Sequence, residues 1–318
     1  MTSMGLEIDN VSKSFGDKIA VNQLSISVPR GSIYGFLGPN GAGKTTTIRM
    51  VMSILFPDSG SIRLFDGIDT MASKDRLGYL PEEKGLYKKM RARELIAYFG
   101  RLKGMKRQVA NDRAAELLTK FGLGDVIEHR CDSLSKGMGQ KVQIIATLLH
   151  EPDLVILDEP FSGLDPINVE VVRDIILQLK RDGKTVIFST HIMEQAEQIC
   201  DYILLMNQGQ KILNGTLAEV KQAASQTIYL EYDGDANQLL HSLPGVSRVN
   251  DMGKAAELSL EPEADHQRIL QSLVGKLDIH QFSVKTPSLH EIFVRSIGGS
   301  TPESNSLVTG EPTDSGST

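Results

Sequence analysis

The sequence predicts an α/β protein with a largely parallel β-sheet covered on both faces, followed by a small α+β domain. Three observations lead to this fold class. From residue 1 to about 220, short β-like runs alternate with helical patterns. From about 225 to 297, the order changes to βαββαβ. The 318 residues leave room for about two domains, and 40% hydrophobic with 23% charged residues is the composition of an ordinary globular protein.

Apolar patterns place the strands of the first region. Leu24, Ile26 and Val28 alternate with polar residues, as in a strand with one buried face. Continuous apolar runs indicate fully buried strands at 33–37, 154–157 and 185–188. Helical patterns occupy 46–55 and 137–149. Because consecutive parallel strands need a crossover, usually a helix, this alternation favours a parallel sheet.

The second region has the pattern of a separate α+β unit, in which Ile228, Leu230 and Tyr232 alternate along a first strand. The same reasoning predicts a helix at 236–242, strands at 246–250 and 257–261, a helix at 265–274, a strand at 279–284 and a last helix after Pro287. Residues 298–318 include 15 Gly, Ser, Thr or Pro and are expected to form a disordered tail. We therefore expect domains at 1–224 and 225–297.

Composition excludes several classes of protein. Two cysteines, Cys131 and Cys200, exclude a disulfide scaffold and a cysteine-based zinc cluster, and they favour a reducing compartment, the cytoplasm. No apolar run approaches the ~18 residues of a membrane helix, and the first ten residues lack the build of a signal peptide. The net charge of −6 argues against a general nucleic-acid binder, since Lys and Arg supply most phosphate affinity.

Charge is unevenly distributed along the chain. Nine basic residues and one acid, Glu94, lie between Lys84 and Arg107. Two interpretations stay open for this basic stretch: a solvated helix face, or a docking surface for an acidic partner or lipid headgroups. From Ser225 to the end the balance is −7, with 13 acids against 6 basic residues.

The chemistry begins with a glycine-rich run between the predicted strand 33–37 and the helix that follows. Its residues are Gly38, Pro39, Asn40, Gly41, Ala42, Gly43, Lys44 and Thr45, followed by Thr46. This is the phosphate-binding loop pattern, in which glycines let successive N–H groups point at phosphate oxygens. Lys44 is expected to neutralise the β- and γ-phosphates of a bound nucleotide, and the Thr45 hydroxyl to bind Mg²⁺. The sequence therefore predicts a P-loop NTPase.

A second element supports this prediction. The strand 154–157 ends in two carboxylates, Asp158 and Glu159, and ligands of such sheets bind beyond the carboxyl ends of the strands. We expect Asp158 to hold Mg²⁺ through water. Glu159 is expected to polarise the water that attacks the γ-phosphate.

The run Leu134–Gln140, LSKGMGQ, resembles the signature motif of the ABC ATPases, usually LSGGQ. The other family motifs follow in order over residues 5 to about 220: the D-loop ends at Asp165, His191 resembles the switch histidine, and Phe15 occupies the adenine-stacking position. Glu82 stands where the family usually has the Q-loop glutamine. The resemblance implies a RecA-like parallel sheet with antiparallel N-terminal strands and a helical subdomain at about 83–135.

The resemblance also implies the remaining site residues. Glu159 and His191 are expected to act in hydrolysis, with His191 on the γ-phosphate. Ser135 and Gly137, at the start of a helix, are expected beside ATP, together with Asp165. Since loop and signature are both present, two copies of this chain would build two complete sites head to tail.

The motif runs and the C-terminal PSLHEIFVR are similar to those of bacterial sodium- or drug-exporter ATPases. This resemblance implies an ATPase that powers export through a separate permease, with the chain peripheral on the inner face of the cell membrane. The basic stretch from Lys84 to Arg107 lies where the family receives a coupling helix. Two other functions stay open: a soluble ABC ATPase acting on nucleic acid or ribosomes, and a nucleotide-binding regulator without hydrolysis. Cargo, permease and homo- or heterodimeric pairing stay undetermined.

Overall fold

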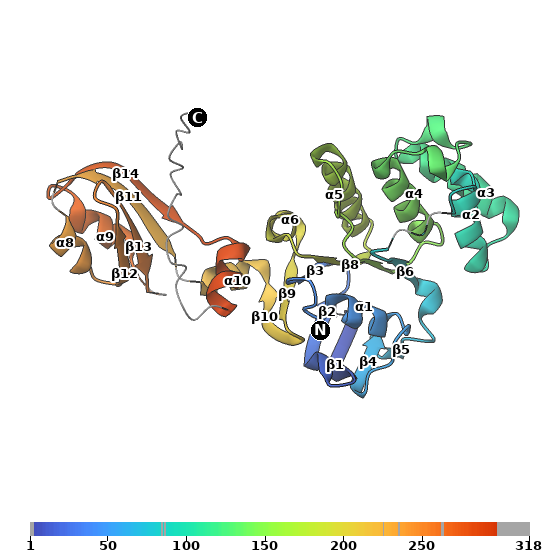
Figure 1. The fold of residues 1–318 in the computed structure, drawn as a ribbon, viewed down its shortest axis with the longest axis horizontal. Coiled ribbons are helices and arrows are strands. Elements are labelled where there is room, and N and C mark those ends of the chain that lie inside the picture. Colours follow the sequence, from blue (N-terminus) through green and yellow to red (C-terminus); the bar gives the residue numbers. More distant parts are fainter. Residues whose placement is uncertain are drawn as a thin grey trace, which may run out of the picture.

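The structure of the chain is a computed structural model. It describes residues 3–83, 85, 87–224, 226–234, 236–261 and 264–297. The expected disordered tail, 298–318, lies outside the described residues. Figure 1 shows two sheets and a helical layer joined to a smaller β-rich unit at the C-terminal end.

A four-stranded antiparallel sheet begins the fold, in the order β2-β1-β4-β5. Its strands are β1 (Met4–Phe15), β2 (Lys18–Pro29), β4 (Ser59–Leu64) and β5 (Ile68–Asp69). Leu24, Ile26 and Val28 of β2 are buried, as their alternation predicted. The antiparallel N-terminal strands are therefore present.

Six strands form the second sheet, in the order β10-β9-β3-β8-β7-β6, and only β10 runs antiparallel to its neighbour. The strands are β3 (Ile33–Leu37), β6 (Leu77–Leu80), β7 (Leu154–Leu157), β8 (Thr185–Thr190), β9 (Tyr202–Asn207) and β10 (Gln210–Thr216). Every residue of β3, β7 and β8 is buried, which is why these strands are nearly continuous apolar runs. The predicted α/β fold is confirmed.

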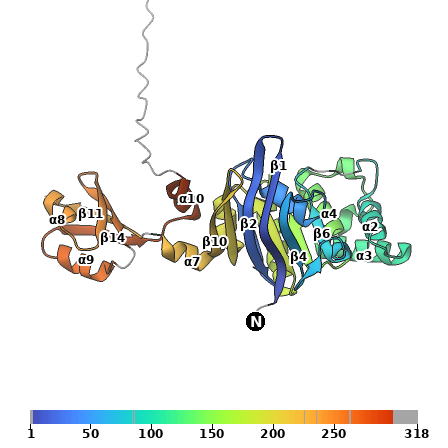
Figure 2. The same ribbon diagram turned by 90° about the horizontal axis from the view of Figure 1, so that it is seen from below.

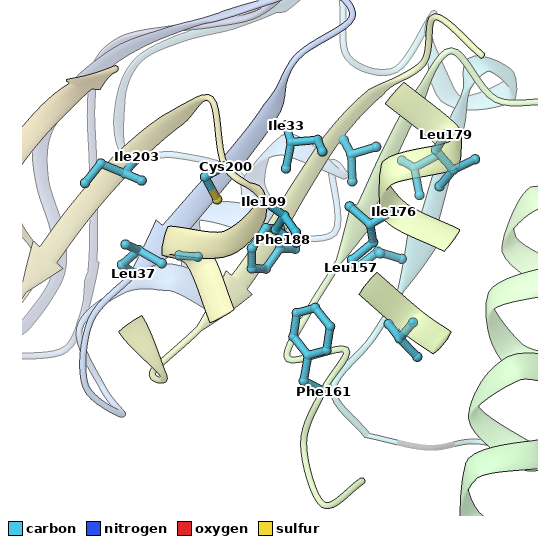
Figure 3. Packing of buried hydrophobic residues seen from close by; sticks show 14 of the residues in the cluster. Ile33, Leu37, Leu157, Phe161, Ile176, Leu179, Phe188, Ile199, Cys200 and Ile203 are labelled. Carbon is cyan, nitrogen blue, oxygen red and sulfur yellow. The ribbon is translucent and has the colours of Figure 1, made fainter. Parts of the chain in front are cut away.

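Alternate side chains of this sheet pack into two different layers. Leu157 and Phe188 face helices α5 and α6, as Figure 3 shows. Phe36, Ile156 and Ile187 point the other way and pack against α1 and the antiparallel sheet. The helices around the sheet are α1 (Lys44–Val51), α4 (Lys136–Leu148), α5 (Pro166–Arg181), α6 (Met193–Ile199) and α7 (Leu217–Ala223).

Helix α1 is shorter than the predicted helix 46–55. The N–H of Ser53 donates to the carbonyl of Met50, and that of Ile54 donates to the carbonyl of Arg49. Ser53 has a φ of +52°. This pair of bonds around a left-handed residue ends an α-helix, so the apolar residues up to 55 lie beyond it.

A helical layer lies beside the β6 edge of the sheet. It contains α2 (Ala92–Leu102), α3 (Arg107–Lys120) and α4, which pack around Leu95, Leu118 and Ile145. Helix α4 also contacts β6, so it joins this layer to the sheet. Within the residues described above, none of the helices combines the length and apolar character that a membrane span requires.

The C-terminal unit is a separate sheet, in the order β12-β13-β11-β14, with its own core. Its elements are β11 (Thr227–Asp233), α8 (Asn237–His241), β12 (Val246–Asp251), β13 (Ala255–Leu260), α9 (His266–Leu273) and β14 (Asp278–Lys285). This is the βαββαβ order. The last described helix, α10 (Leu289–Ile297), leaves that sheet (Figure 1) and packs on α6.

The Phe188→Ala variant tests the central layer. Phe188 is fully buried on β8, and its ring meets Phe161 edge-on at 5.7 Å between centroids. Truncation of a buried phenylalanine costs about 3–5 kcal/mol of the free energy of unfolding. The matched control, Phe56→Ala, removes a side chain that is 66% exposed and is expected to change stability by less than about 0.5 kcal/mol. Chemical unfolding followed by far-UV circular dichroism measures both, and equal losses would contradict this packing.

Candidate functional site

The loop of residues 38–45 joins the end of β3 to the start of α1. Gly38, Gly41 and Gly43 have φ angles of +143°, +80° and +107°, which side chains rarely adopt. A Cβ on Gly38 would lie 2.1 Å from the carbonyl oxygen of Met206. The glycines therefore permit both the curl of the loop and its close approach to the neighbouring strand.

The first residue of α1, Lys44, carries a buried ammonium group. Its side chain is folded back over the loop, where Nζ donates to the carbonyls of Gly38 at 2.6 Å and Pro39 at 3.2 Å. Nζ also lies 3.6 Å from Oε1 of Glu159. Burial lowers the pKa of Lys44, and the carboxylates of Glu159 and Asp158 act in the opposite direction.

Asp158 lies immediately beyond β7 and is 1% exposed. Its Oδ1 accepts hydrogen bonds from the hydroxyls of Ser189 at 2.5 Å and Thr45 at 3.3 Å. Among the described residues, its buried Oδ2 has no hydrogen-bond partner. A carboxylate with a free oxygen next to a threonine hydroxyl is a set of hard oxygen donors, which fits Mg²⁺.

Glu159 has a left-handed backbone, with a φ of +48°, and its side chain is buried. Its N–H donates to the hydroxyl of Ser189 at 2.9 Å. Its Oε2 lies 3.0 Å from Nδ1 of His191, which follows β8 directly. A positive φ at a residue other than glycine is uncommon and recurs at functional sites, where the surrounding contacts hold it.

Ser189 was missed by the sequence reasoning. Its hydroxyl joins the two acidic residues, because it donates to Asp158 and accepts from the backbone of Glu159. The available signal was its place, two residues before His191, at the carboxyl end of a buried strand next to β7.

A cavity of about 400 Å³ brings the loop and several predicted residues together. Residues 40–46, Phe15, Glu82 and Glu159 line it. Phe15 is half exposed, and Nζ of Lys13 lies over its ring, 5.7 Å from the centroid. Lys18, which the sequence reasoning also missed, adds a cation to the wall.

Ser135, Gly137 and Asp165 do not line this cavity. The Ser135 hydroxyl caps α4 by accepting from the N–H of Met138 at 3.3 Å. Asp165 caps α5 by accepting from the N–H of Asn168 at 3.0 Å, and both bonds from Asn168 lower the pKa of this carboxyl. A Cβ on Gly137 would lie 2.4 Å from the same asparagine. These three residues therefore form a second cluster, at the starts of α4 and α5.

Comparison with known families agrees with this geometry. The profile of the ABC transporter family matches residues 21–162, which include the glycine-rich loop and both carboxylates. A second profile, the C-terminal domain of DrrA1-3-like ATP-binding proteins, matches residues 215–297.

Whole-length relatives point the same way. The ABC transporter ATP-binding protein YhaQ of Bacillus subtilis is 38% identical over 293 residues, 92% of this chain and 98% of that protein. The daunorubicin/doxorubicin resistance ATP-binding protein DrrA of Streptomyces peucetius is 33% identical over 305 residues, 92% of each chain.

The fold agrees with that of a solved relative. The structure of an ATP-binding subunit of an ABC transporter superposes with a TM-score of 0.62 at 30% identity, over 69% of this chain and 92% of that one. The chain thus belongs to the ATP-binding proteins of ABC transporters, a family of ATPases, and is the nucleotide-binding subunit that works with a separate permease.

Proposed function

We propose that this subunit hydrolyses ATP at sites shared between two protomers and so powers export through its permease. The observation that carries the proposal is the division of the site residues into two clusters. Lys44, Asp158, Glu159 and His191 converge at one end of the sheet, whereas Ser135 and its neighbours lie apart at two helix starts.

The first cluster supplies the groups that hydrolysis requires. The loop N–H groups and Lys44 bind the β- and γ-phosphates and offset their charge. Thr45 and Asp158 are the residues that would hold Mg²⁺, which neutralises phosphate charge when bound. We assign Glu159 to accept a proton from the attacking water, and Nδ1 of His191 lies 3.0 Å from that carboxylate. The exposed ring of His191 is assigned to the γ-phosphate. This pairing favours hydrolysis over a regulator that only binds nucleotide.

The second cluster supports a composite site. Ser135 is exposed, and it caps a helix whose first N–H groups form a site suited to a phosphate. Ser135 and Gly137 have no place in this chain's own cavity, so we assign them to the ATP held by a second copy. Asp165 lies beside them and is assigned to the same protomer contact.

A groove beside the helical layer is assigned to the permease. It has a volume of about 410 Å³ and is lined by apolar and aromatic side chains, among them Tyr87, Leu95, Phe99 and Leu102. The rings of Tyr87, Tyr98 and Phe99 cluster within 6.4 Å of one another, between centroids. A contiguous exposed apolar surface is typical of an interaction site. Binding there would hold the chain on the inner face of the membrane.

The basic stretch from Lys84 to Arg107 is only partly available to a partner. Arg91 and Arg93 both pair with Glu128, at 2.8 and 2.6 Å. Lys103 turns inward to the carbonyl of Lys74, and burial lowers its pKa. The aromatic groove therefore supports docking better than the charge of the stretch does.

The relatives suggest the type of cargo. DrrA is named for resistance to daunorubicin and doxorubicin, and it matches this chain along 92% of both lengths. We therefore propose a drug-like organic cargo. The sodium exporters that the motif runs resemble remain the second candidate.

Two substitutions separate binding from hydrolysis. Lys44→Ala removes the cation that faces the phosphates and is expected to cost about 2–5 kcal/mol of ATP-binding free energy. Glu159→Gln keeps the shape of the site but loses the base, so hydrolysis is expected to fall about 10²–10⁴-fold with binding retained. Fluorescent-nucleotide titration and phosphate release measure the two effects. Full hydrolysis by Glu159→Gln would contradict the assignment.

Mixing two inactive variants tests the composite site. Ser135→Arg fills the surface that faces the second copy's ATP, and Lys44→Ala disables the loop. Each mixed dimer would keep one intact site, so the mixture is expected to hydrolyse ATP faster than either parent. Ser133→Arg, at a nearby exposed serine, serves as the control and is expected to keep its own activity. Absence of rescue at every mixing ratio would mean that one chain builds the whole site.

The docking groove is tested by Phe99→Glu, which places a charge among the aromatic rings. Extraction of membranes with detergent and purification of the tagged chain are expected to recover at least about tenfold less permease than wild type, since burying an unpaired charge is costly. The ATPase rate of the isolated chain is expected to stay unchanged. The control is Phe56→Ala, at a side chain exposed on the loop after α1. Undiminished recovery with Phe99→Glu would place the permease elsewhere.

A further inference from the structure

The last helix of the chain returns to the ATPase core. After the C-terminal sheet, α10 packs on α6. Figure 2 shows that α10 also lies beside α7. Leu289 and Ile292 of α10 are 2% and 5% exposed, and they join the core that contains Met193 and Ala196 of α6. Helix α10 is thus part of the layer that covers the six-stranded sheet.

One carboxylate, Glu197 of α6, fastens this contact. Its Oε1 accepts the first N–H of α10, that of Leu289, at 2.9 Å. The same oxygen lies 2.9 Å from Nζ of Lys221 on α7. The Glu197 side chain is only 19% exposed. A charge-assisted bond in a partly buried place is worth more than a surface pair, so Glu197 holds α6, α7 and α10 together.

Helix α10 is itself well formed at the end that meets Glu197. The N–H of Ser288 donates to Oε2 of Glu291 at 2.7 Å, and the N–H of Glu291 donates to the Ser288 hydroxyl at 3.2 Å. This reciprocal cap fixes the direction of the first turn. The N–H of Leu289 is thereby presented to Glu197 as a rigid donor.

Helix α6 leads directly to the proposed γ-phosphate contact. It begins at Met193, two residues after His191. On the other side of the histidine, the Thr190 hydroxyl donates to Oε1 of Gln195 at 2.9 Å and accepts from the N–H of Ile192 at 3.1 Å. The Thr190 hydroxyl therefore joins the two residues that flank His191 to the side chain of Gln195 in the first turn of α6, so that a shift of α6 moves the histidine.

We propose that Glu197 and α10 position His191 for hydrolysis by holding α6 against the sheet. Glu197 is not among the residues that line the cavity, so it is a positioning residue and not a catalytic one. A loosened α6 leaves the loop and Lys44 in place but lets the imidazole move away from Glu159. This inference rests on the proposed role of His191.

Substitutions in the full-length chain test the proposal. Glu197→Ala removes the shared acceptor and Ile292→Ala removes the apolar contact, and each is expected to lower kcat about three- to tenfold with the KM for Mg-ATP changed by less than about twofold. Glu197→Gln keeps an acceptor oxygen and is expected to retain most of kcat. The control is Val294→Ala, at a side chain of α10 that is 41% exposed, and it is expected to match wild type. Thermal unfolding of each variant monitors folding.

Repeating both variants in a His191→Ala background decides the mechanism. If α10 acts through His191, the fold-change in kcat is expected to disappear there, because the group being positioned is gone. An undiminished fold-change in that background, or an unchanged kcat in Glu197→Ala and Ile292→Ala, overturns the inference and leaves the proposed function intact. A wild-type kcat in His191→Ala itself overturns both this inference and the proposed role of the histidine.

Discussion

The fold depends on keeping three charged side chains buried at one end of a parallel sheet. Lys44, Asp158 and Glu159 are each less than a tenth exposed. Isolated charges there would cost several kcal/mol each, so these groups need their mutual contacts and hydrogen bonds. The strand order brings the contacting groups together. Strand β8 lies between β3 and β7 and places Ser189 between the two acidic residues.

The same edge also contains backbone in the left-handed region of φ. The loop glycines take up positive φ angles at little cost, but Glu159 does so with a full side chain. Such a conformation costs of order 1–3 kcal/mol and persists only when the surroundings determine it. Two contacts determine the conformation of Glu159: the hydrogen bond from its N–H to Ser189 and the contact of its side chain with His191. Ser189 belongs to the neighbouring strand β8, and His191 directly follows that strand. The strained residue is thus held by the element that completes the site.

Sequence reasoning reached the parts of the site whose signals are local. The loop 38–45 and the pair Asp158–Glu159 each directly follow a buried apolar run. The sequence therefore predicted both the kind of site residue and its position at the carboxyl end of a strand. The sequence signal for Ser189 was weak. The role of this residue depends on the position of β8 between two strands that are distant in sequence. No sequence signal predicted that α10 docks on α6, because nothing near Leu289 indicates that the carboxylate of Glu197 accepts its N–H.

The contact at Glu197 also closes a loop of chain. Lys221, just before the C-terminal sheet, and Leu289, just after it, meet at the same carboxylate oxygen. The whole βαββαβ unit is therefore an insertion with two fixed ends and not a free appendage. The entropy of closing such a loop grows only logarithmically, by about 0.6 kcal/mol for each doubling of its length. The inserted unit can consequently be enlarged, shortened or exchanged at little thermodynamic cost, provided that its two ends still reach one carboxylate.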